Sequence, residues 1–549
     1  MLLFVGPSVT LVVNPWNNYD PISLPKMFVL VCCAFTIFAL LAVNRTDVSK
    51  TVPKTFLLSI LVFFSCLVIT VLFSGAPFNQ QLWGAFGRNT GFLTYASLCI
   101  ILVALVWAGN ENFYSRISWL FVLTSVPMTF YCLVQLTGND PIPWSEFNTF
   151  GTLGNINFLS AFLGMTSVGA CAYALDRKVK PIIRILLLAL AVGDLLIIYS
   201  TGSIQGPIIF FVGVGILILT YIVGMKRGRS ISLSAYLFLV FATAYLLISA
   251  LQNKGPLAAI VYQPSVIFRG DYIHAGWEMT MAKPIFGVGM DSYGDWYRFA
   301  RGEISTLRTG PDRIANTAHN IFLDISSNGG MLLGLVYVAI VLFALFAGVQ
   351  LLKTSIGATT FFRVIFAAWC AYQVQALVSI NQIGVGIWGW IFTGSLIGMY
   401  AKREEPVAPS HQRQYRNSRK QFRSAYLPAS HALLTFVGFS VGFVLAVIPL
   451  ANDIRYRDAA SRGDIEQMIR VTSALGSTQF HRELALEFAL RNSFTPEAKR
   501  VAESLVADYP RNFFGWQVLA LSGIATEEER ALALARAREL DPFNPKLRT

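Results

Sequence analysis

Apolar runs of about twenty residues recur along most of this 549-residue chain. An α-helix needs a run of that length to cross a hydrocarbon core about 30 Å thick. The clear runs lie at 26–43, 54–74, 91–108, 116–136, 155–176, 181–199, 203–223, 231–251, 319–350, 361–380, 384–401 and 430–450. A further run at 1–13 is marginal as a span. With 54% hydrophobic and 13% charged residues, the chain is too apolar for a soluble globular protein. We therefore expect an all-α, polytopic membrane protein with 12 or 13 spans.

Lysine and arginine residues orient these spans, because cytoplasmic loops carry an excess of them. Basic clusters at 45–54, 177–184, 226–229 and 353–363 predict cytoplasmic loops. The alternation holds through every span only if residues 1–13 also cross, with the N-terminus in the cytoplasm. The long loop at 252–318 and the C-terminal region then lie outside the cytoplasmic membrane. Residues 1–13 lack a basic start and a small-residue cleavage site, so no cleavable signal peptide is expected.

Changes in composition divide the chain into four parts. Residues 1–401 form the polytopic domain, 402–429 a basic cytoplasmic linker, 430–450 the last transmembrane helix and 451–549 a small helical domain. From residue 451 onward the chain carries 14 Lys/Arg and 14 Asp/Glu, so the whole net charge of +13 belongs to the membrane part. That excess indicates membrane topology and lipid headgroups, with no nucleic acid. Apolar residues at helical spacing, with Trp516, Ala520 and Pro542, predict tetratricopeptide-like helix pairs in the last part.

The cysteines all lie inside apolar runs, so neither a disulfide framework nor a zinc site is expected. The chain shows no acidic cluster suited to a divalent metal. We therefore predict no metal and no other cofactor.

The loop at 252–318 and the start of the following span hold the candidate chemistry. His319 lies near the membrane boundary, where an imidazole can take a proton from a hydroxyl near neutral pH. The alternative is that His319 and Asn320 only cap a helix and anchor it at the headgroups. If the helix begins there, Asn320 and Asp324 share a face and His319 points about 100° away from Asn320.

Arg269 begins a segment predicted to lie as an amphipathic helix on the outer interface, with Ile273, Trp277 and Met281 on one stripe. Arg301, Arg308 and Arg313 make the loop positive, and a guanidinium suits bidentate contact with phosphate. For any single arginine, pairing with an ordinary lipid headgroup or a nearby carboxylate is at least as good an explanation. The candidates for binding substrate or diphosphate are Arg269, Arg88, Arg313, His274, Asn320, Asp324 and Gln205.

Several short motifs, in this order and spacing, resemble the O-antigen ligase and Wzy-type polymerase superfamily. They are Gly87-Arg88-Asn-Thr-Gly91, Gly154-Asn-Ile-Asn157, Arg269, Pro284-Ile-Phe-Gly287-Val-Gly289 and Ala318-His319-Asn320-Ile-Phe-Leu-Asp324. The resemblance implies a metal-independent, inverting glycosyltransferase of the GT-C-like helical class. It also implies that His319 is the general base, that Arg269 holds the diphosphate and that Arg88 assists. Many members carry Ser-Arg-Gly where this chain reads Ser203-Ile-Gln205-Gly206, so a phosphate contact must come from elsewhere, such as Arg88 or Arg313.

The resemblance implies transfer of a glycan from a polyprenyl-diphosphate carrier to an acceptor hydroxyl, in cell-surface polysaccharide assembly. The acceptor is a glycan, a lipid or a protein, and the sequence does not choose among them. Two other classes stay open: a flippase or exporter of lipid-linked glycans, and a scaffold whose C-terminal part recruits envelope-assembly proteins. The absence of a convincing repeat between the two halves favours the enzyme over a transporter.

Overall fold

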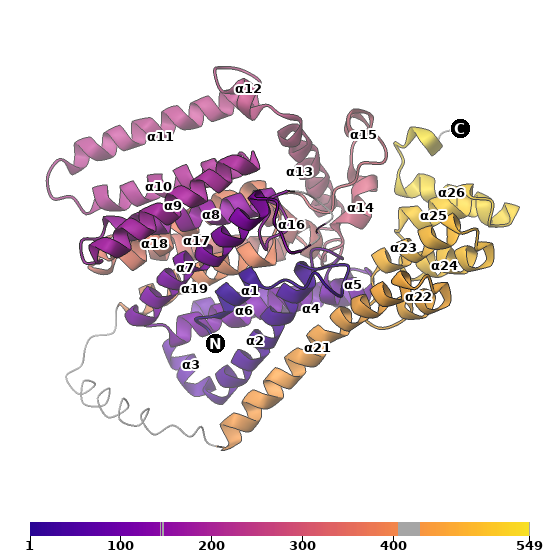
Figure 1. Ribbon diagram of the computed structural model, residues 1–549, viewed down its shortest axis with the longest axis horizontal. Coiled ribbons are helices and arrows are strands. Elements are labelled where there is room, and N and C mark those ends of the chain that lie inside the picture. Colours follow the sequence, from indigo (N-terminus) through magenta and orange to yellow (C-terminus); the bar gives the residue numbers. More distant parts are fainter. Residues whose placement is uncertain (143, 145–147, 404–428, 548–549) are drawn as a thin grey trace.

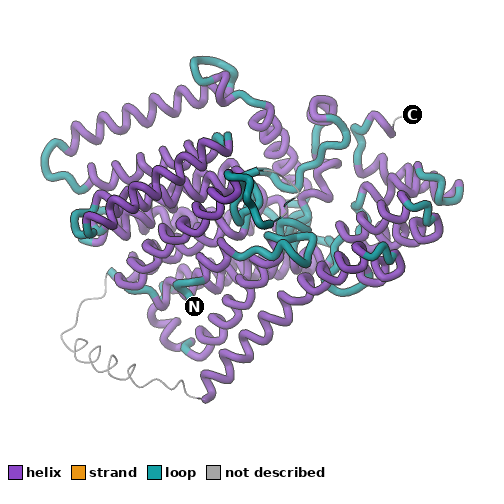
Figure 2. The backbone as a smooth tube through the Cα atoms, in the orientation of Figure 1, coloured by secondary structure: helices purple, strands orange, loops and turns teal. Residues whose placement is uncertain are grey.

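The computed structural model describes residues 1–142, 144, 148–403 and 429–547. Throughout these ranges the chain forms helices and no strand (Figure 2). The helices in these ranges that are long and apolar enough to cross a membrane are α2 (Ser23–Val43), α4 (Lys54–Phe73), α7 (Glu111–Leu136), α8 (Ile156–Leu175), α9 (Pro181–Thr201), α10 (Gln205–Val223), α11 (Arg229–Leu251), α17 (Met331–Leu351), α18 (Thr360–Val378), α19 (Ile383–Lys402) and α21 (Ala429–Ser461). A shorter apolar helix, α6 (Phe92–Ala108), accounts for the remaining run. The prediction of a polytopic, all-helical membrane protein is confirmed.

Helix α19 forms the centre of the bundle, and 94% of its most apolar stretch is buried. It contains glycines that let neighbouring helices approach closely, as small residues do between membrane helices. Gly389 lies against the ring of Tyr372 on α18, and Gly398 lies against Tyr114 on α7. Helix α11 is the opposite case, because none of its apolar stretch is buried, and it lies at the edge of the molecule in Figure 1.

The first segment does not cross the bundle. Its helix α1 (Val5–Leu11) has seven residues and is therefore about 10 Å long. The Thr10 hydroxyl donates to the carbonyl of Gly384 at the start of α19 (2.8 Å). The ammonium of Lys26 donates to three carbonyls at the end of α1, including that of Thr10 (2.7 Å), and so satisfies groups that a helix end leaves free. The run at 1–13, marginal as a span in the sequence, therefore forms a helix too short to cross the membrane. The cytoplasmic N-terminus stays a prediction.

The predicted span at 319–350 is not one continuous helix, because the chain forms two helices there. The short helix α16 (Ile321–Gly329) ends at Gly330, whose φ of 87° is a conformation that side-chain-bearing residues rarely adopt. The membrane-spanning helix α17 begins only at Met331. The membrane-spanning helix therefore begins at Met331, twelve residues after the start predicted from the apolar pattern.

The long segment between α11 and α16 lies on one face of the bundle. We call this face of the bundle the loop face. That segment forms α12 (Ala258–Val261), α13 (Pro264–Ala282), α14 (Tyr293–Ala300) and α15 (Glu303–Thr309). Shorter elements elsewhere are α3 (Arg45–Thr51), α5 (Phe78–Trp83) and η1 (Ile356–Ala358). Loops gather where the bundle meets the C-terminal helices, as Figure 2 shows.

The C-terminal part is attached to the bundle by one continuous helix. Helix α21 packs along α2 and then runs past the expected boundary at residue 451 into the tail (Figure 1). The tail continues with α22 (Ile465–Thr472), α23 (Gln479–Arg491), α24 (Thr495–Asp508), α25 (Phe513–Leu521), α26 (Glu527–Leu540) and η2 (Pro545–Leu547). These helices enclose their own hydrophobic core, which contains Leu486, Leu505 and Val518. The tetratricopeptide-type assignment stays a prediction. Of the predicted linker at 402–429, residues 404–428 lie outside the described ranges.

The tail is fixed to the loop face by buried polar contacts. One Arg301 nitrogen donates to both carboxylate oxygens of Asp541 (2.8 and 2.9 Å), and both side chains are fully buried. An apolar contact is added by Phe86, in the loop between α5 and α6, whose ring stacks on that of Phe480 with the centroids 4.0 Å apart. The sequence had placed Arg301 among the cations that make the loop positive, but its charge is used to hold the tail.

Candidate active site

The Pro284–Gly289 turn fixes the position of α16 on the loop face. The backbone N–H groups of Val288 and Gly289 donate to carbonyls at the end of α16, at 2.9 and 3.0 Å. The N–H of Met331 donates to the Pro284 carbonyl (2.8 Å). Gly287, with φ of 65°, lies so close to the Asn328 carbonyl that a side chain would collide with it. The glycines of this turn therefore allow backbone to lie directly on backbone.

His319 lies just outside α16, and its backbone is left-handed, with φ of 51°. Its N–H donates to the Thr317 hydroxyl (2.8 Å). The side chain of Asn320 accepts from the Leu323 N–H (3.0 Å) and so caps α16. A left-handed, non-glycine residue costs about 1–3 kcal/mol and is often found at functional sites. The expected helical angle between His319 and Asn320 does not apply, because His319 is not in the helix.

The imidazole of His319 lies beside Tyr272 of α13, with ring centroids 5.2 Å apart. Burial, helped by the positive charges of Arg269 and Arg88, lowers the pKa of His319 to about 4. The ring is therefore neutral at pH 7, and a neutral imidazole has a free nitrogen lone pair that can accept a proton.

Two arginines near Tyr272, Arg269 and Arg313, form no ion pair with a carboxylate among the described residues. Across the described ranges, Arg269 donates no hydrogen bond and forms no ion pair. The Arg313 guanidinium lies over the ring of Phe268, 4.6 Å from its centroid. Both arginines are close enough to Tyr272 for their charges to lower the pKa of its hydroxyl, which burial raises. We call His319, Tyr272, Arg269 and Arg313 the His319 cluster.

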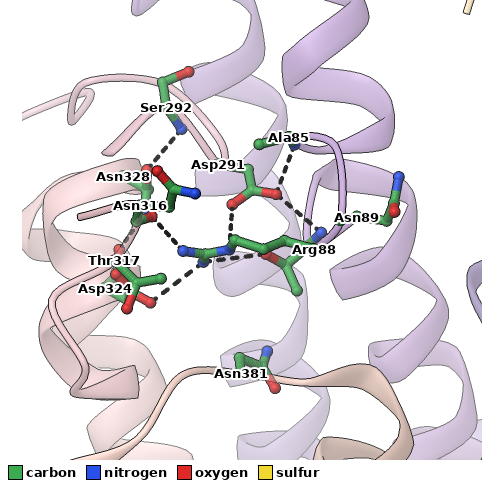
Figure 3. A network of polar contacts seen from close by, with 12 residues as sticks. Ala85, Arg88, Asn89, Asp291, Ser292, Asn316, Thr317, Asp324, Asn328 and Asn381 are labelled. Carbon is green, nitrogen blue, oxygen red and sulfur yellow. Dashed lines mark hydrogen bonds and ion pairs between the residues drawn. The ribbon is translucent and has the colours of Figure 1, made fainter. Parts of the chain in front are cut away.

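Arg88 is placed differently, because two carboxylates surround its buried guanidinium (Figure 3). Its Nε lies 3.2 Å from Asp291 and its Nη2 lies 3.4 Å from Asp324. Its Nη1 donates to the carbonyl of Asn316. Burial raises the pKa of Asp324 to about 6, although Arg88 acts in the opposite direction. We call these four residues the Arg88 cluster, and it joins the α5–α6 loop to the loop that carries His319.

Residues 185–338 match the family model Wzy_C, described as O-Antigen ligase. This segment of the chain is therefore similar to O-antigen ligases. The match supports the superfamily that the motifs suggested, and a ligase- or polymerase-like role of a multi-pass membrane protein in polysaccharide assembly. No curated protein matches the chain.

The matched segment contains the whole His319 cluster, whereas Arg88 and the tail lie outside it. It runs from α9 to the first third of α17. His319, Arg269 and Arg313 therefore belong to the matched segment, and the Arg88 cluster connects that segment to the preceding helices.

The structure separates three predicted site residues from the His319 cluster. His274 is 66% exposed on another side of α13 and lies 3.9 Å from Glu278. Asn320 caps α16 and donates to the Leu377 carbonyl (3.2 Å). Gln205 is buried and accepts from Gln375 (3.2 Å). Asn320 and Gln205 contact other helices, and His274 lies on a different face of α13 from Arg269 and Tyr272.

Asp324 also has a structural role, because one carboxylate oxygen accepts from the Ala318 N–H (2.9 Å) while the other pairs with Arg88. This carboxylate therefore fixes the turn before His319. Within the described ranges no three His, Cys, Asp or Glu side chains are grouped as a metal site would require.

The sequence did not place Tyr272 among the candidate site residues, although a signal for it was present. Tyr272 lies three residues after Arg269, so both are on one face of α13, whereas His274 at five residues is not. Asp291 was also missed as a partner of Arg88. No local pattern identifies it, because 203 positions separate the two residues.

Proposed function

We propose that this protein transfers a glycan from a polyprenyl-diphosphate carrier to an acceptor hydroxyl at the outer face of the cytoplasmic membrane. The observation that carries the proposal is a neutral imidazole, His319, beside Arg269, a guanidinium with no partner in the described part of the chain. A proton acceptor next to an unneutralised cation suits a reaction that removes a proton and releases an anion.

In the proposed reaction, the His319 ring takes the proton of the acceptor hydroxyl. The hydroxyl oxygen forms a bond to C1 of the donor sugar, on the side opposite the diphosphate, so the configuration at C1 inverts. The bond between C1 and the diphosphate oxygen breaks, and the electron pair leaves with the diphosphate. Arg269 and Arg313 stabilise the negative charge of that leaving group. This chemistry needs no metal ion.

The exposed apolar stripe of α13 supports delivery from the bilayer. Ile273, Trp277 and Met281 are 39–55% exposed. The opposite side of the same helix is buried and includes Ala275 and Met279. An interfacial helix has this arrangement. It would keep Arg269 and Tyr272 at the depth of lipid phosphates.

The test is a comparison of cells that lack the protein with cells that carry His319→Ala or His274→Ala. Loss of the protein is expected to leave lipid-linked glycan on the outer leaflet and to remove the transferred product, both measured by mass spectrometry. His319→Ala is expected to behave like the deletion, and His274→Ala like the unaltered protein. Accumulation on the inner leaflet would instead identify a flippase or exporter. Normal product from His319→Ala would refute the proposed base.

A further inference from the structure

A cavity of about 380 Å³ lies between the tail and the loop face, next to the Arg88 cluster. Asp295 and Arg298 of α14 form one wall, and Glu483, Arg511 and Phe513 of the tail form the other. Asp291 and Asn316, both members of the Arg88 cluster, also line it. Asn316 is three residues before His319 in the chain, so this part of the lining lies in the loop that carries His319.

The walls of this cavity are held rigidly by side-chain hydrogen bonds. Asp295 accepts from Gln479 (2.8 Å) and from Gln80 (2.7 Å), which come from the tail and from α5. Asn512 donates both to Gln479 (3.2 Å) and to Glu483. The cavity thus has a fixed shape, as small-molecule sites usually do.

Two buried polar atoms in these walls have no partner among the described residues. The Oε1 atom of Gln80, a residue only 5% exposed, is an acceptor without a donor. The Nη2 atom of Arg511 is a donor without an acceptor, although the guanidinium stacks on Trp296 at 3.5 Å. An unpaired buried polar atom costs about 1–3 kcal/mol. A hydroxyl group donates one hydrogen bond and accepts others, so hydroxyls satisfy atoms of both kinds.

The cavity offers a diphosphate little free positive charge. Three carboxylates (Asp291, Asp295 and Glu483) lie in its walls against two guanidiniums (Arg298 and Arg511). Arg298 is already paired with Asp541 at 3.0 Å. Phe86, Phe480, Phe513 and Phe514 add aromatic surface beside these groups. Hydrogen-bonding groups of both kinds next to aromatic rings suit an uncharged sugar, whose hydroxyls form hydrogen bonds and whose C–H faces pack on rings.

We propose that this cavity binds a sugar residue of the acceptor, which makes the acceptor a glycan and the tail a part of its binding site. The inference rests on the proposed function and narrows its acceptor class. The lipid-linked donor approaches from the bilayer, and its anionic group is held by Arg269 and Arg313. The acceptor enters from the aqueous side, between tail and loop, and its hydroxyl reaches His319 past Asn316.

The test measures binding to the full-length protein in lipid nanodiscs. The probe is a set of short, lipid-free oligosaccharides released by mild acid from the surface polysaccharide of the same cells. The unaltered protein is expected to bind the probe saturably. Glu483→Leu and Phe514→Ala are each expected to weaken binding about tenfold, the loss expected for one or two contacts. Two independent variants, each checked for an unchanged melting temperature, guard against misfolding.

Glu487→Gln is the matched control, because Glu487 lies one turn along α23, is exposed and pairs with Arg491. It is expected to bind within about twofold of the unaltered protein. His319→Ala is expected to bind the probe normally while transferring nothing, so failure of the proposed function and failure of the cavity assignment give different results. Absence of saturable binding, equal binding by Glu483→Leu and Glu487→Gln, or binding of a serine-rich peptide in place of the oligosaccharide would overturn the inference.

Discussion

Arg88 and Arg269 both bring positive charge to His319, yet their own surroundings differ. Arg88 is 8% exposed and lies between the carboxylates of Asp291 and Asp324. Arg269 is half-buried and has no partner within the described ranges. A charge surrounded by carboxylates stabilises the fold, whereas an unneutralised charge at the edge of a site remains available to an incoming anion. We therefore propose different roles for two arginines that the sequence grouped together as phosphate ligands.

The largest effect is expected for Arg88→Met, which should lower the stability of the fold. The substitution leaves two buried carboxylates without a counter-charge, which costs about 3–5 kcal/mol. A lower melting temperature of the purified protein, measured by the fluorescence of its tryptophans, checks this. Adding Asp324→Asn removes one of the unpaired charges and is expected to recover part of the loss. An unchanged melting temperature for Arg88→Met would show that the Arg88 cluster does not hold the loop.

The second largest effect is expected for Arg269→Met, which should lower the rate of glycan transfer. Removing one preorganised group that stabilises developing charge costs about 10²–10³-fold in rate. Because Arg269 has no partner in the described part of the fold, the melting temperature is expected to stay the same. Rates with a lipid-linked donor and unfolding curves, measured on one preparation, separate the two quantities. Loss of stability without loss of rate would reverse the roles assigned to Arg88 and Arg269.

The pH dependence of transfer sharpens the comparison further. The pKa of His319 is lowered to about 4, so the proton-accepting form predominates above about pH 5. The rate is expected to be flat from about pH 7 to 5 and to fall about tenfold per pH unit below 4. Arg269→Met removes a nearby positive charge, so the pKa of His319 rises and the acid limb moves to higher pH. If Arg269→Met leaves the acid limb of the pH profile unchanged, Arg269 does not influence the pKa of His319.

The smallest effect is expected from Arg308→Met. Arg308 is 43% exposed and pairs with Asp271 at 3.5 Å, and a surface pair contributes about 0–1 kcal/mol. Melting temperature and transfer rate are therefore both expected to stay close to those of the unaltered protein. A large loss of stability or of transfer rate would show that Arg308 acts together with Arg269 and Arg313.

The sequence predicted the membrane helices well because their signal is local: the length and apolarity of a run decide whether it spans. It failed where a distant contact decides the structure. Gly330 ends α16 because the Pro284–Gly289 turn packs on it, and Lys26 of α2 stabilises the short helix α1.

The same distinction applies to the site. The order of the motifs predicted that Arg269 and His319 belong to one site, and helical spacing indicates Tyr272 as a neighbour of Arg269. The partners of Arg88 at 291 and 324, and the pairing of Arg301 with Asp541, are side-chain contacts across more than 200 residues. No periodicity encodes them, so the sequence left Arg88 and Arg301 as free cations.

The most direct test of the central claim is a single-turnover transfer assay with purified protein, a lipid-linked glycan donor and a saturating acceptor. His319→Ala is expected to lower the transfer rate by about 10²–10⁴-fold while donor binding and melting temperature stay unchanged, because the variant lacks only the proton acceptor. Transfer by His319→Ala at the rate of the unaltered protein would contradict the account.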